Sequence, residues 1–339
     1  MRPELEKLLS KAKITPSSFI EEVQRLPTGS LMLDFALGGG WARGRFNVLW
    51  GMDNTGKTTL SLLACAAAQR LGEDAWVMYI DTENKFDARW TKALGVDLER
   101  LAYYQPKTGE EAGNIVLKAL ELSPAPQIIV LDSLAAMPWV AEAEGTMDDM
   151  TMGVAARKLA QFCRLTVPEL AKTQIVLLLV NQATQIIGAG RYEYPLKAKG
   201  GMHVAHAASI RVEMRRIKKL VDSNNTPVGM ALSAHIEKNQ TADNHPPKSA
   251  EINLLLRPPR VDHLFELVTL GKELNLFLDE DGEPITGARK WYFAGQPVGT
   301  GVKQVMATLE TNADLRTRLA QAIQAASGIS CVLETYETP

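Results

Sequence analysis

The sequence predicts an α/β protein built on a twisted, mainly parallel sheet with helices on both faces. First, apolar strand-like runs alternate with helical runs through the central part of the chain. Second, a G-x-x-x-x-G-K-[ST] loop at residues 51–59 lies between a strand-like run and an Ala/Leu-rich helical run. Third, 339 residues with 46% hydrophobic composition can form a large core with one or two small appendages.

The expected elements follow in chain order. Residues 3–13 form a short amphipathic helix, which must dock on its own core or on a neighbouring chain because a helix this short is unstable alone. The residue pattern changes at the two prolines 258–259, and beyond about residue 262 follows a mixed α/β segment that ends in a helix-like run at 302–325. Between them we expect strands at 45–50, 76–80, 101–104, 127–131, 174–180, 208–215, 229–237 and 250–256, and helices at 58–68, 87–94, 109–122 and 153–171.

Composition excludes several classes of protein. The net charge of −2 means that any nucleic-acid binding must come from local basic patches. Cys65, Cys163 and Cys331 are scattered without a C-x-x-C pair, as expected for reduced, mostly buried thiols in the cytosol. No apolar run approaches about 18 residues, and the N-terminus lacks the apolar region of a signal peptide. We therefore expect a soluble, cytoplasmic protein that binds no membrane.

The loop at residues 51–59 has the complete pattern of a nucleotide phosphate site. Lys57 supplies a mobile cation to the β- and γ-phosphates, and the Thr58 hydroxyl can bind Mg²⁺. A chance glycine-rich turn is disfavoured because the flanking strand and helix are both present, and the helix N-terminus adds partial positive charge. The residues expected to contact nucleotide here are Gly51, Met52, Asp53, Asn54, Thr55, Gly56, Lys57, Thr58 and Thr59.

Three further strand ends carry polar residues suited to nucleotide chemistry. Asp132 follows an apolar run and could hold Mg²⁺ through a water. Glu83 could orient the water that attacks the γ-phosphate, although it or Asp81 could instead cap the following helix. Gln182 could sense the γ-phosphate, although buried amides at strand ends are often structural.

Together these and other motifs resemble the RecA recombinase family, as a bacterial or phage-encoded relative. The similarity runs from about residue 26 to 325 and rests on segments that occur in the family's order: residues 28–34, 51–59, 81–83, 105–110, 131–133, 144–145, 152–157, 181–182 and 200–201. Met-Gly-Val-Ala-Ala-Arg at 152–157 and Asn181-Gln182 are the most specific of them. The resemblance implies a RecA-like ATPase core over 28–261, an N-terminal polymerisation helix and linker over 1–27, and a small C-terminal α/β domain over 262–339.

The resemblance also assigns roles in the nucleotide site. It implies a DNA-dependent ATPase that uses ATP and Mg²⁺, with Glu83 as the water-activating carboxylate and Gln182 as the γ-phosphate sensor. Asp87 and Trp90 fall where the family reads the adenine, and Trp90 would stack on the base. Without the resemblance, a core aromatic on an amphipathic helix would be the preferred interpretation of Trp90.

Two segments match the family's DNA-binding loops, at about residues 144–152 and 183–199. Positions that resemble apolar wedges between bases are Met152 and Ile187. Phosphate contacts are expected from Arg157 and Arg164 on the helix after the first loop, which give affinity without sequence information. The second loop combines basic residues with Tyr192 and Tyr194, as suits single-strand binding; its basic residues are Arg191, Lys197 and Lys199.

The chain also departs from the family pattern. Of two lysines that reach across the protomer interface to ATP, Lys238 is present but Gln240 replaces the second, so less charge reaches the phosphates. His206 replaces an aromatic interface residue, which puts cooperativity in doubt. Thr184 and Ile186 stand where basic residues are usual, and residues 331–339 contain only two glutamates instead of a strongly acidic tail.

Three functional hypotheses follow. The leading one is a recombinase of DNA recombination and repair, which forms helical filaments on single-stranded DNA and pairs it with homologous duplex in the cytoplasm of a bacterial or phage-infected cell. Its partners would be DNA, further copies of itself, and a single-strand-binding protein or loader. Gln240 and His206 instead favour a RecA-fold ATP-binding regulator without strand exchange. A ring-forming ATPase is the third, which the N-terminal helix and residues 152–157 disfavour.

Overall fold

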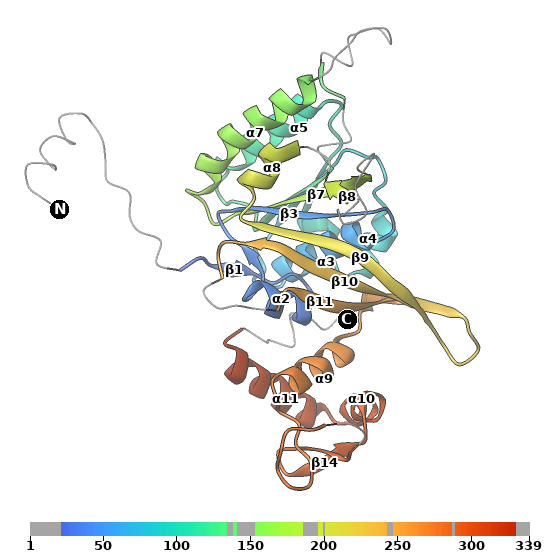
Figure 1. Cartoon of the computed structure of the whole chain (residues 1–339). Coiled ribbons are helices and arrows are strands. Elements are labelled where there is room, and N and C mark those ends of the chain that lie inside the picture. Colours follow the sequence, from blue (N-terminus) through green and yellow to red (C-terminus); the bar gives the residue numbers. More distant parts are fainter. Residues whose placement is uncertain are drawn as a thin grey trace, which may run out of the picture.

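The computed structural model describes residues 22–133, 138–140, 153–185, 196–198, 201–242, 247–286 and 289–329. Within these residues, ten strands form one sheet in the order β12-β11-β10-β9-β3-β7-β6-β4-β5, with β8 paired to β7 (Figure 1). The strands of this sheet are β3 (Phe46–Gly51), β4 (Val77–Asp81), β5 (Leu101–Tyr104), β6 (Ile128–Asp132), β7 (Val176–Gln185), β8 (Leu196–Ala198), β9 (Ile210–Val221), β10 (Pro227–Asn239), β11 (Ser249–Leu256) and β12 (Pro259–Val261).

The central strands are parallel, which confirms the predicted sheet. β3 pairs in parallel with β7 and β9, β6 with β7 and β4, and β4 with β5. These strands read as nearly continuous apolar runs because both faces of the sheet are covered. β10, β11 and β12 extend the sheet in antiparallel pairing, and the hairpin of β9 and β10 projects beyond the core (Figure 1).

Two helical layers bury the two faces of the sheet. One face packs against α3 (Lys57–Gln69), whose Ala and Leu side chains are almost entirely buried, and against α2 (Leu31–Leu37) and α4 (Ala88–Ala93). The other packs against α5 (Gly109–Ala119), α7 (Val154–Leu170) and α8 (Gly201–Ala207). A short 3₁₀ helix, Leu98–Arg100, precedes β5, and β1 (Arg25–Leu26) pairs with β2 (Trp41–Ala42) at the start of the core. Cys65 and Cys163 are buried and free, as predicted, whereas Cys331 lies outside the described residues.

The C-terminal part contains α9 (His263–Glu273), β13 (Trp291–Phe293), β14 (Gln296–Gly299), α10 (Val302–Thr311) and α11 (Ala313–Ser327). The helical run predicted over 302–325 is two helices and not one, because Asn312 leaves the helical conformation. Its side chain instead caps α11 by accepting a hydrogen bond from the backbone N–H of Leu315 at 3.0 Å.

A buried carboxylate joins the C-terminal part to the core. Glu266 on α9 is fully buried and accepts hydrogen bonds from the Ser30 hydroxyl at 2.5 Å and the Leu31 backbone N–H at 2.8 Å. Both donors lie at the N-terminus of α2, where the helix dipole favours negative charge. The expected helix at 3–13 lies outside the described residues, and no described helix is long and apolar enough to cross a bilayer.

Candidate functional site

The glycine-rich loop connects β3 to α3 at the carboxyl edge of the parallel strands. A Cβ at Gly51, the last residue of β3, would collide with the backbone carbonyl of Met214 on β9. Gly56 has φ of 78°, and a Cβ there would lie 2.6 Å from Leu232 Cδ1. Both positions therefore require glycine. α3 begins directly after the loop, at Lys57, so the positive end of its dipole faces the same place.

Lys57 is buried within the loop. Its Nζ donates a hydrogen bond to the carbonyl oxygen of Met52 at 2.7 Å. Burial lowers the pKa of Lys57, while the nearby carboxylates of Asp53, Asp132 and Glu83 act in the opposite direction. Because the hydrogen-bond partner is a neutral carbonyl, the positive charge is available to an incoming phosphate.

The predicted magnesium residues contact each other. Thr58 Oγ1 donates a hydrogen bond to Asp132 Oδ2 at 2.8 Å, and Asp132 is the last residue of β6. Burial raises the pKa of Asp132, and hydrogen bonds from the Tyr79 and Thr58 hydroxyls oppose that shift. A hydroxyl and a carboxylate beside a phosphate loop fit Mg²⁺, which usually takes one or two carboxylates together with substrate phosphates and waters. Among the described residues, no group of three or more His, Cys, Asp or Glu side chains could hold a metal by itself.

Glu83 and Gln182 are brought together across the sheet edge. Gln182 Nε2 donates a hydrogen bond to Glu83 Oε1 at 2.7 Å, although the two residues are 99 positions apart. The other carboxylate oxygen, Oε2, pairs with Lys85 Nζ at 2.7 Å, and this contact raises the pKa of the exposed Lys85. Sequence reasoning missed Lys85, whose only signal was its place two residues after Glu83.

The acidic residues near Glu83 have clear structural contacts. Asp81 accepts hydrogen bonds from the backbone N–H groups of Glu83, Lys85 and Phe86, so it holds the turn after β4. Asp87 caps α4 by accepting from the N–H groups of Arg89 and Trp90. Glu83 itself accepts side-chain donors, so the alternative that Glu83 or Asp81 caps the following helix is wrong: the N-cap of α4 is Asp87.

A cavity of about 400 Å³ collects most of the predicted nucleotide residues. Trp90 is half-buried against the core, and neither it nor Asp87 lines this cavity. Gly51 and Met52 are likewise outside the lining, although both belong to the loop. The lining residues are Asp53, Asn54, Thr55, Gly56, Lys57, Thr58, Thr59, Glu83, Lys85, Asp132, Val180, Asn181 and Gln182.

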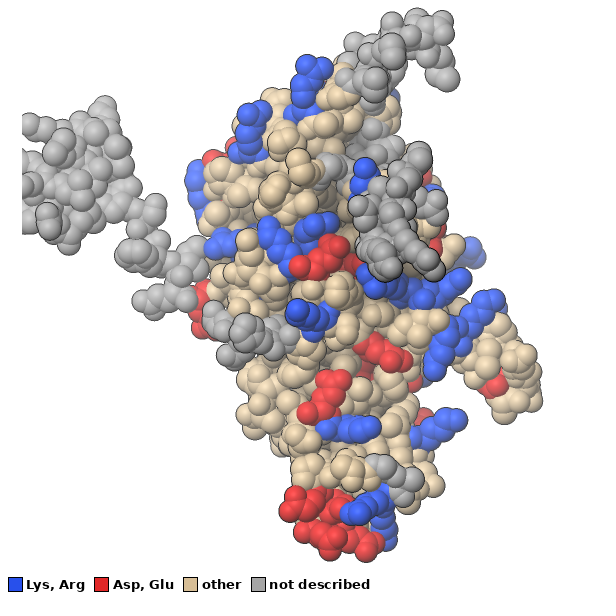
Figure 2. Space-filling view, viewed as in Figure 1, with Lys and Arg blue, Asp and Glu red and all other residues tan. Residues whose placement is uncertain are grey.

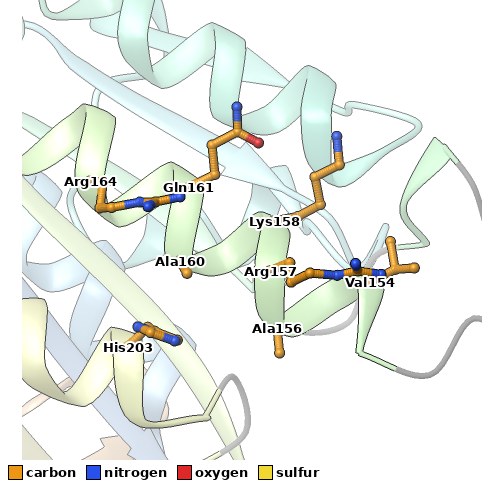
Figure 3. A pocket seen from close by; sticks show the side chains of 8 residues that line it. All are labelled: Val154, Ala156, Arg157, Lys158, Ala160, Gln161, Arg164 and His203. Carbon is orange, nitrogen blue, oxygen red and sulfur yellow. The ribbon is translucent and has the colours of Figure 1, made fainter.

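A second cavity, of about 530 Å³, lies between α7 and α8. Arg157 and Arg164 line it from α7, and His203 lies across from them on α8 (Figure 3). Both arginine side chains are exposed, and neither forms an ion pair with a carboxylate in the part of the chain that the structure describes. Lys158 also lines this cavity, but it pairs with Glu110 at 3.3 Å. Sequence reasoning missed Lys158 and His203.

The second predicted DNA-binding segment is partly a β-ladder. β8 pairs antiparallel with the end of β7, and the exposed Lys197 is opposite Thr184. The other residues expected to contact DNA lie outside the described residues, namely Met152, Ile187, Arg191 and Lys199.

A further basic surface lies on the projecting hairpin of β9 and β10. Four basic side chains of β9 are exposed there, and lysine and arginine gather over this part of the surface in Figure 2. No sequence motif had indicated it, because the residues follow a buried strand without a break. The four exposed basic residues of β9 are Arg215, Arg216, Lys218 and Lys219.

The residues expected at the protomer interface lie apart from the loop of their own chain. Lys238 Nζ donates hydrogen bonds to the carbonyl oxygens of Ala205 and His206 at 3.3 and 3.2 Å, at the C-terminal end of α8. Gln240 is exposed just after β10, and its backbone N–H donates to Ser209. None of Lys238, Gln240 and His206 lines the nucleotide cavity.

Comparison with known proteins decides the family. The model of the RecA N-terminal domain matches residues 4–258. The chain belongs to the RecA family. Protein RecA of Lactobacillus delbrueckii subsp. bulgaricus is 34% identical over 94% of this chain and 83% of its own length. Protein RecA of Chlorobaculum tepidum is 34% identical over 94% and 89%, and that of Levilactobacillus brevis is 34% identical over 91% and 78%. Membership of the RecA family supports a recombinase function and implies the use of ATP, Mg²⁺ and DNA.

Proposed function

We propose that this chain is an ATP-dependent DNA recombinase that forms helical filaments on single-stranded DNA and catalyses homologous pairing and strand exchange. The observation that carries this proposal is the hydrogen bond between Gln182 and Glu83. It joins a carboxylate of the nucleotide cavity to β7, the strand that leads into the second segment expected to bind DNA. Strand β7 could therefore couple the binding of nucleotide to the binding of DNA.

ATP hydrolysis follows from the lining of the nucleotide cavity. Lys57 and the loop backbone would bind the phosphates, and Thr58 and Asp132 would hold Mg²⁺, which neutralises developing phosphate charge when bound. Glu83 would orient the attacking water by accepting its hydrogen bond. Gln182 would exchange its contact with Glu83 for one with the γ-phosphate. We also propose that Asp87 and Trp90 contact the adenine.

DNA binding is proposed for the cavity between α7 and α8. Arg157 and Arg164 carry exposed charge that no described carboxylate neutralises, and such charge binds phosphates of any sequence. The second segment would add Ile187 as an apolar wedge and a set of basic contacts, and Met152 would be the wedge of the first. Those basic contacts are Arg191, Lys197 and Lys199.

Filament assembly is proposed to use the exposed residues near α8 and the chain's N-terminus. Lys238 and Gln240 would approach the ATP of a neighbouring protomer, and residues 1–27 would dock on a neighbour's core. We further propose a core at 28–261 and a C-terminal domain at 262–339, on the grounds that β12 ends at Val261 and α9 begins at His263. We expect this to occur in the bacterial cytoplasm, with a single-strand-binding protein or loader as a possible partner.

The test is electron microscopy and ATPase measurement with ATP, Mg²⁺ and single-stranded DNA, followed by a strand-exchange assay with homologous duplex. Helical filaments, DNA-stimulated hydrolysis and exchanged strands are expected from the natural protein. Lys57→Ala should abolish all three while leaving a folded monomer, because Lys57 supplies charge at the phosphates. Filaments without exchange would favour the regulatory alternative, and closed rings would favour the ring ATPase.

A further inference from the structure

Tyr79 on β4 reaches the carboxylate that would help to hold Mg²⁺. Its hydroxyl donates a hydrogen bond to Asp132 Oδ2 at 2.7 Å, the same oxygen that accepts from Thr58 Oγ1 at 2.8 Å. Tyr79 is 2% exposed, so water cannot replace this donor. The phenol O–H donates and an ionised carboxylate can only accept, so the direction of this hydrogen bond is fixed.

The backbone around Asp132 is fixed from the same strand. The Thr82 backbone N–H donates to the Asp132 carbonyl oxygen at 2.8 Å. The Thr82 hydroxyl accepts from the Ser133 N–H at 2.7 Å and donates to the Ser133 carbonyl oxygen at 2.5 Å. β4 and the residue that follows it therefore hold the end of β6, at the backbone through Thr82 and at the carboxylate through Tyr79.

These contacts determine which carboxylate oxygen Asp132 offers to the cavity. With Oδ2 engaged by two hydroxyls, the remaining oxygen, Oδ1, is left for the metal's hydration shell. The Thr58 proton points to Asp132, so the lone pairs of its hydroxyl can face the metal. We propose that Tyr79 is a positioning residue that orients the Asp132 carboxylate and the Thr58 hydroxyl for Mg²⁺ bound with ATP. This inference rests on the ATP site proposed above.

The test compares nucleotide affinity with and without Mg²⁺, with a fluorescent non-hydrolysable ATP analogue as the probe. The measured quantity is the ratio of the dissociation constant in EDTA to that in excess Mg²⁺. Tyr79→Phe removes one oxygen and leaves the side-chain volume otherwise unchanged. We expect it to reduce the ratio about tenfold, as for other groups that orient metal ligands, and to leave the EDTA value within about twofold.

Tyr103→Phe is the matched control. Tyr103 on β5 also donates its hydroxyl to a carboxylate, Asp81 Oδ2 at 3.1 Å, but neither residue lines the nucleotide cavity. The control should leave the ratio unchanged. A structural role alone would make Tyr79→Phe weaken binding equally in both conditions, and that result would overturn the inference.

A double-mutant cycle provides a readout without nucleotide. Urea unfolding of Tyr79→Phe, Asp132→Ala and the double variant should show non-additive effects, because either single change removes the same hydrogen bond and it can be lost only once. Additive effects would overturn the inference. If the natural protein fails to bind the analogue under any condition, the proposed ATP site itself fails. If it binds with Mg²⁺ enhancement and Tyr79→Phe retains the same ratio, only the role of Tyr79 is wrong.

Discussion

Glu83 is held by two donors that differ in their exposure and in their place in the fold. The Gln182 amide lies on β7 and is fixed by the sheet, whereas Lys85 is a mostly exposed side chain two residues away. An exposed ion pair contributes little to stability, so Lys85 can leave Glu83 at small cost when a phosphate attracts it. Before ATP binds, the contact from Gln182 is therefore the one expected to position the carboxylate.

We expect Glu83→Gln to keep ATP binding and to lower hydrolysis by about 100-fold or more, because only the activation of water is lost. Filaments formed with ATP should then persist much longer than those of the natural protein. The measurement is single-turnover hydrolysis combined with nucleotide binding. Glu99→Gln, an identical charge change at an exposed position outside the cavity, is the control. Unchanged turnover in Glu83→Gln would place the water-activating group elsewhere.

Helix α7 presents charge to the solvent on one side and packs into the core on the other. Leu159, Phe162 and Cys163 are buried against the sheet, which turns Arg157 and Arg164 towards the cavity shared with α8. Because the packed face fixes the rotation of the helix, both guanidinium groups line the same cavity. Two exposed cations beside one cavity suit the phosphate contacts proposed above.

We expect Arg157→Ala to weaken single-strand binding about equally for all sequences and to reduce the salt dependence by about one unit of slope. Binding isotherms for several oligonucleotides at a series of salt concentrations measure both effects. Lys172→Ala is the control, because Lys172 lies beyond the end of α7 and pairs with Glu169. A loss confined to particular base sequences would contradict a phosphate contact.

The C-terminal part is joined to the core through one buried carboxylate as well as by apolar packing. Removing the Glu266 carboxylate leaves the Ser30 hydroxyl and the Leu31 N–H without this hydrogen-bond acceptor at the start of α2. We expect Glu266→Ala to lower the free energy of unfolding by about 2–4 kcal/mol. Urea denaturation measures this, with the exposed Glu310→Ala on α10 as the control. Equal midpoints for the two variants would show that packing alone holds the joint.

Gln240, which replaces the second of the family's two interface lysines, is expected to affect the assembly of many copies. If ATP lies between protomers, Lys238 and Gln240 of one chain approach phosphates held by Lys57 of the next. One cation in place of two leaves that interface less stabilised, because charge-assisted hydrogen bonds are roughly twice as strong as neutral ones.

We therefore expect Gln240→Lys to raise ATP-dependent filament stability or DNA-stimulated hydrolysis. Filament disassembly against salt, at equal protein concentration for both proteins, measures the effect. If the variant assembles no better, either Gln240 does not face the phosphate or another residue already supplies the charge. Lys85, which lines the cavity of its own chain, is the first residue to examine in that case.

The sequence by itself determined the features that depend on local spacing. The glycine-rich loop, the apolar runs of the parallel strands and the positions of Asp132 at the end of β6 and of Glu83 just after β4 are all readable from neighbouring residues, and the parallel sheet is confirmed. β7 runs on to Gln185, beyond the strand expected at 174–180, so Gln182 lies within the strand and not at its end. The helical run predicted at 302–325 did not show its division into α10 and α11, because the apolar pattern continues through Asn312, which caps α11.

Only the tertiary structure decided which distant residues meet. The contacts of Gln182 with Glu83, of Tyr79 with Asp132 and of Glu266 with Ser30 join positions 99, 53 and 236 residues apart. Such contacts depend on the order of strands in the sheet and on how α9 packs against α2, and no local pattern encodes either. Tyr79 in particular reads as an ordinary aromatic of a buried strand until β4 and β6 are placed side by side.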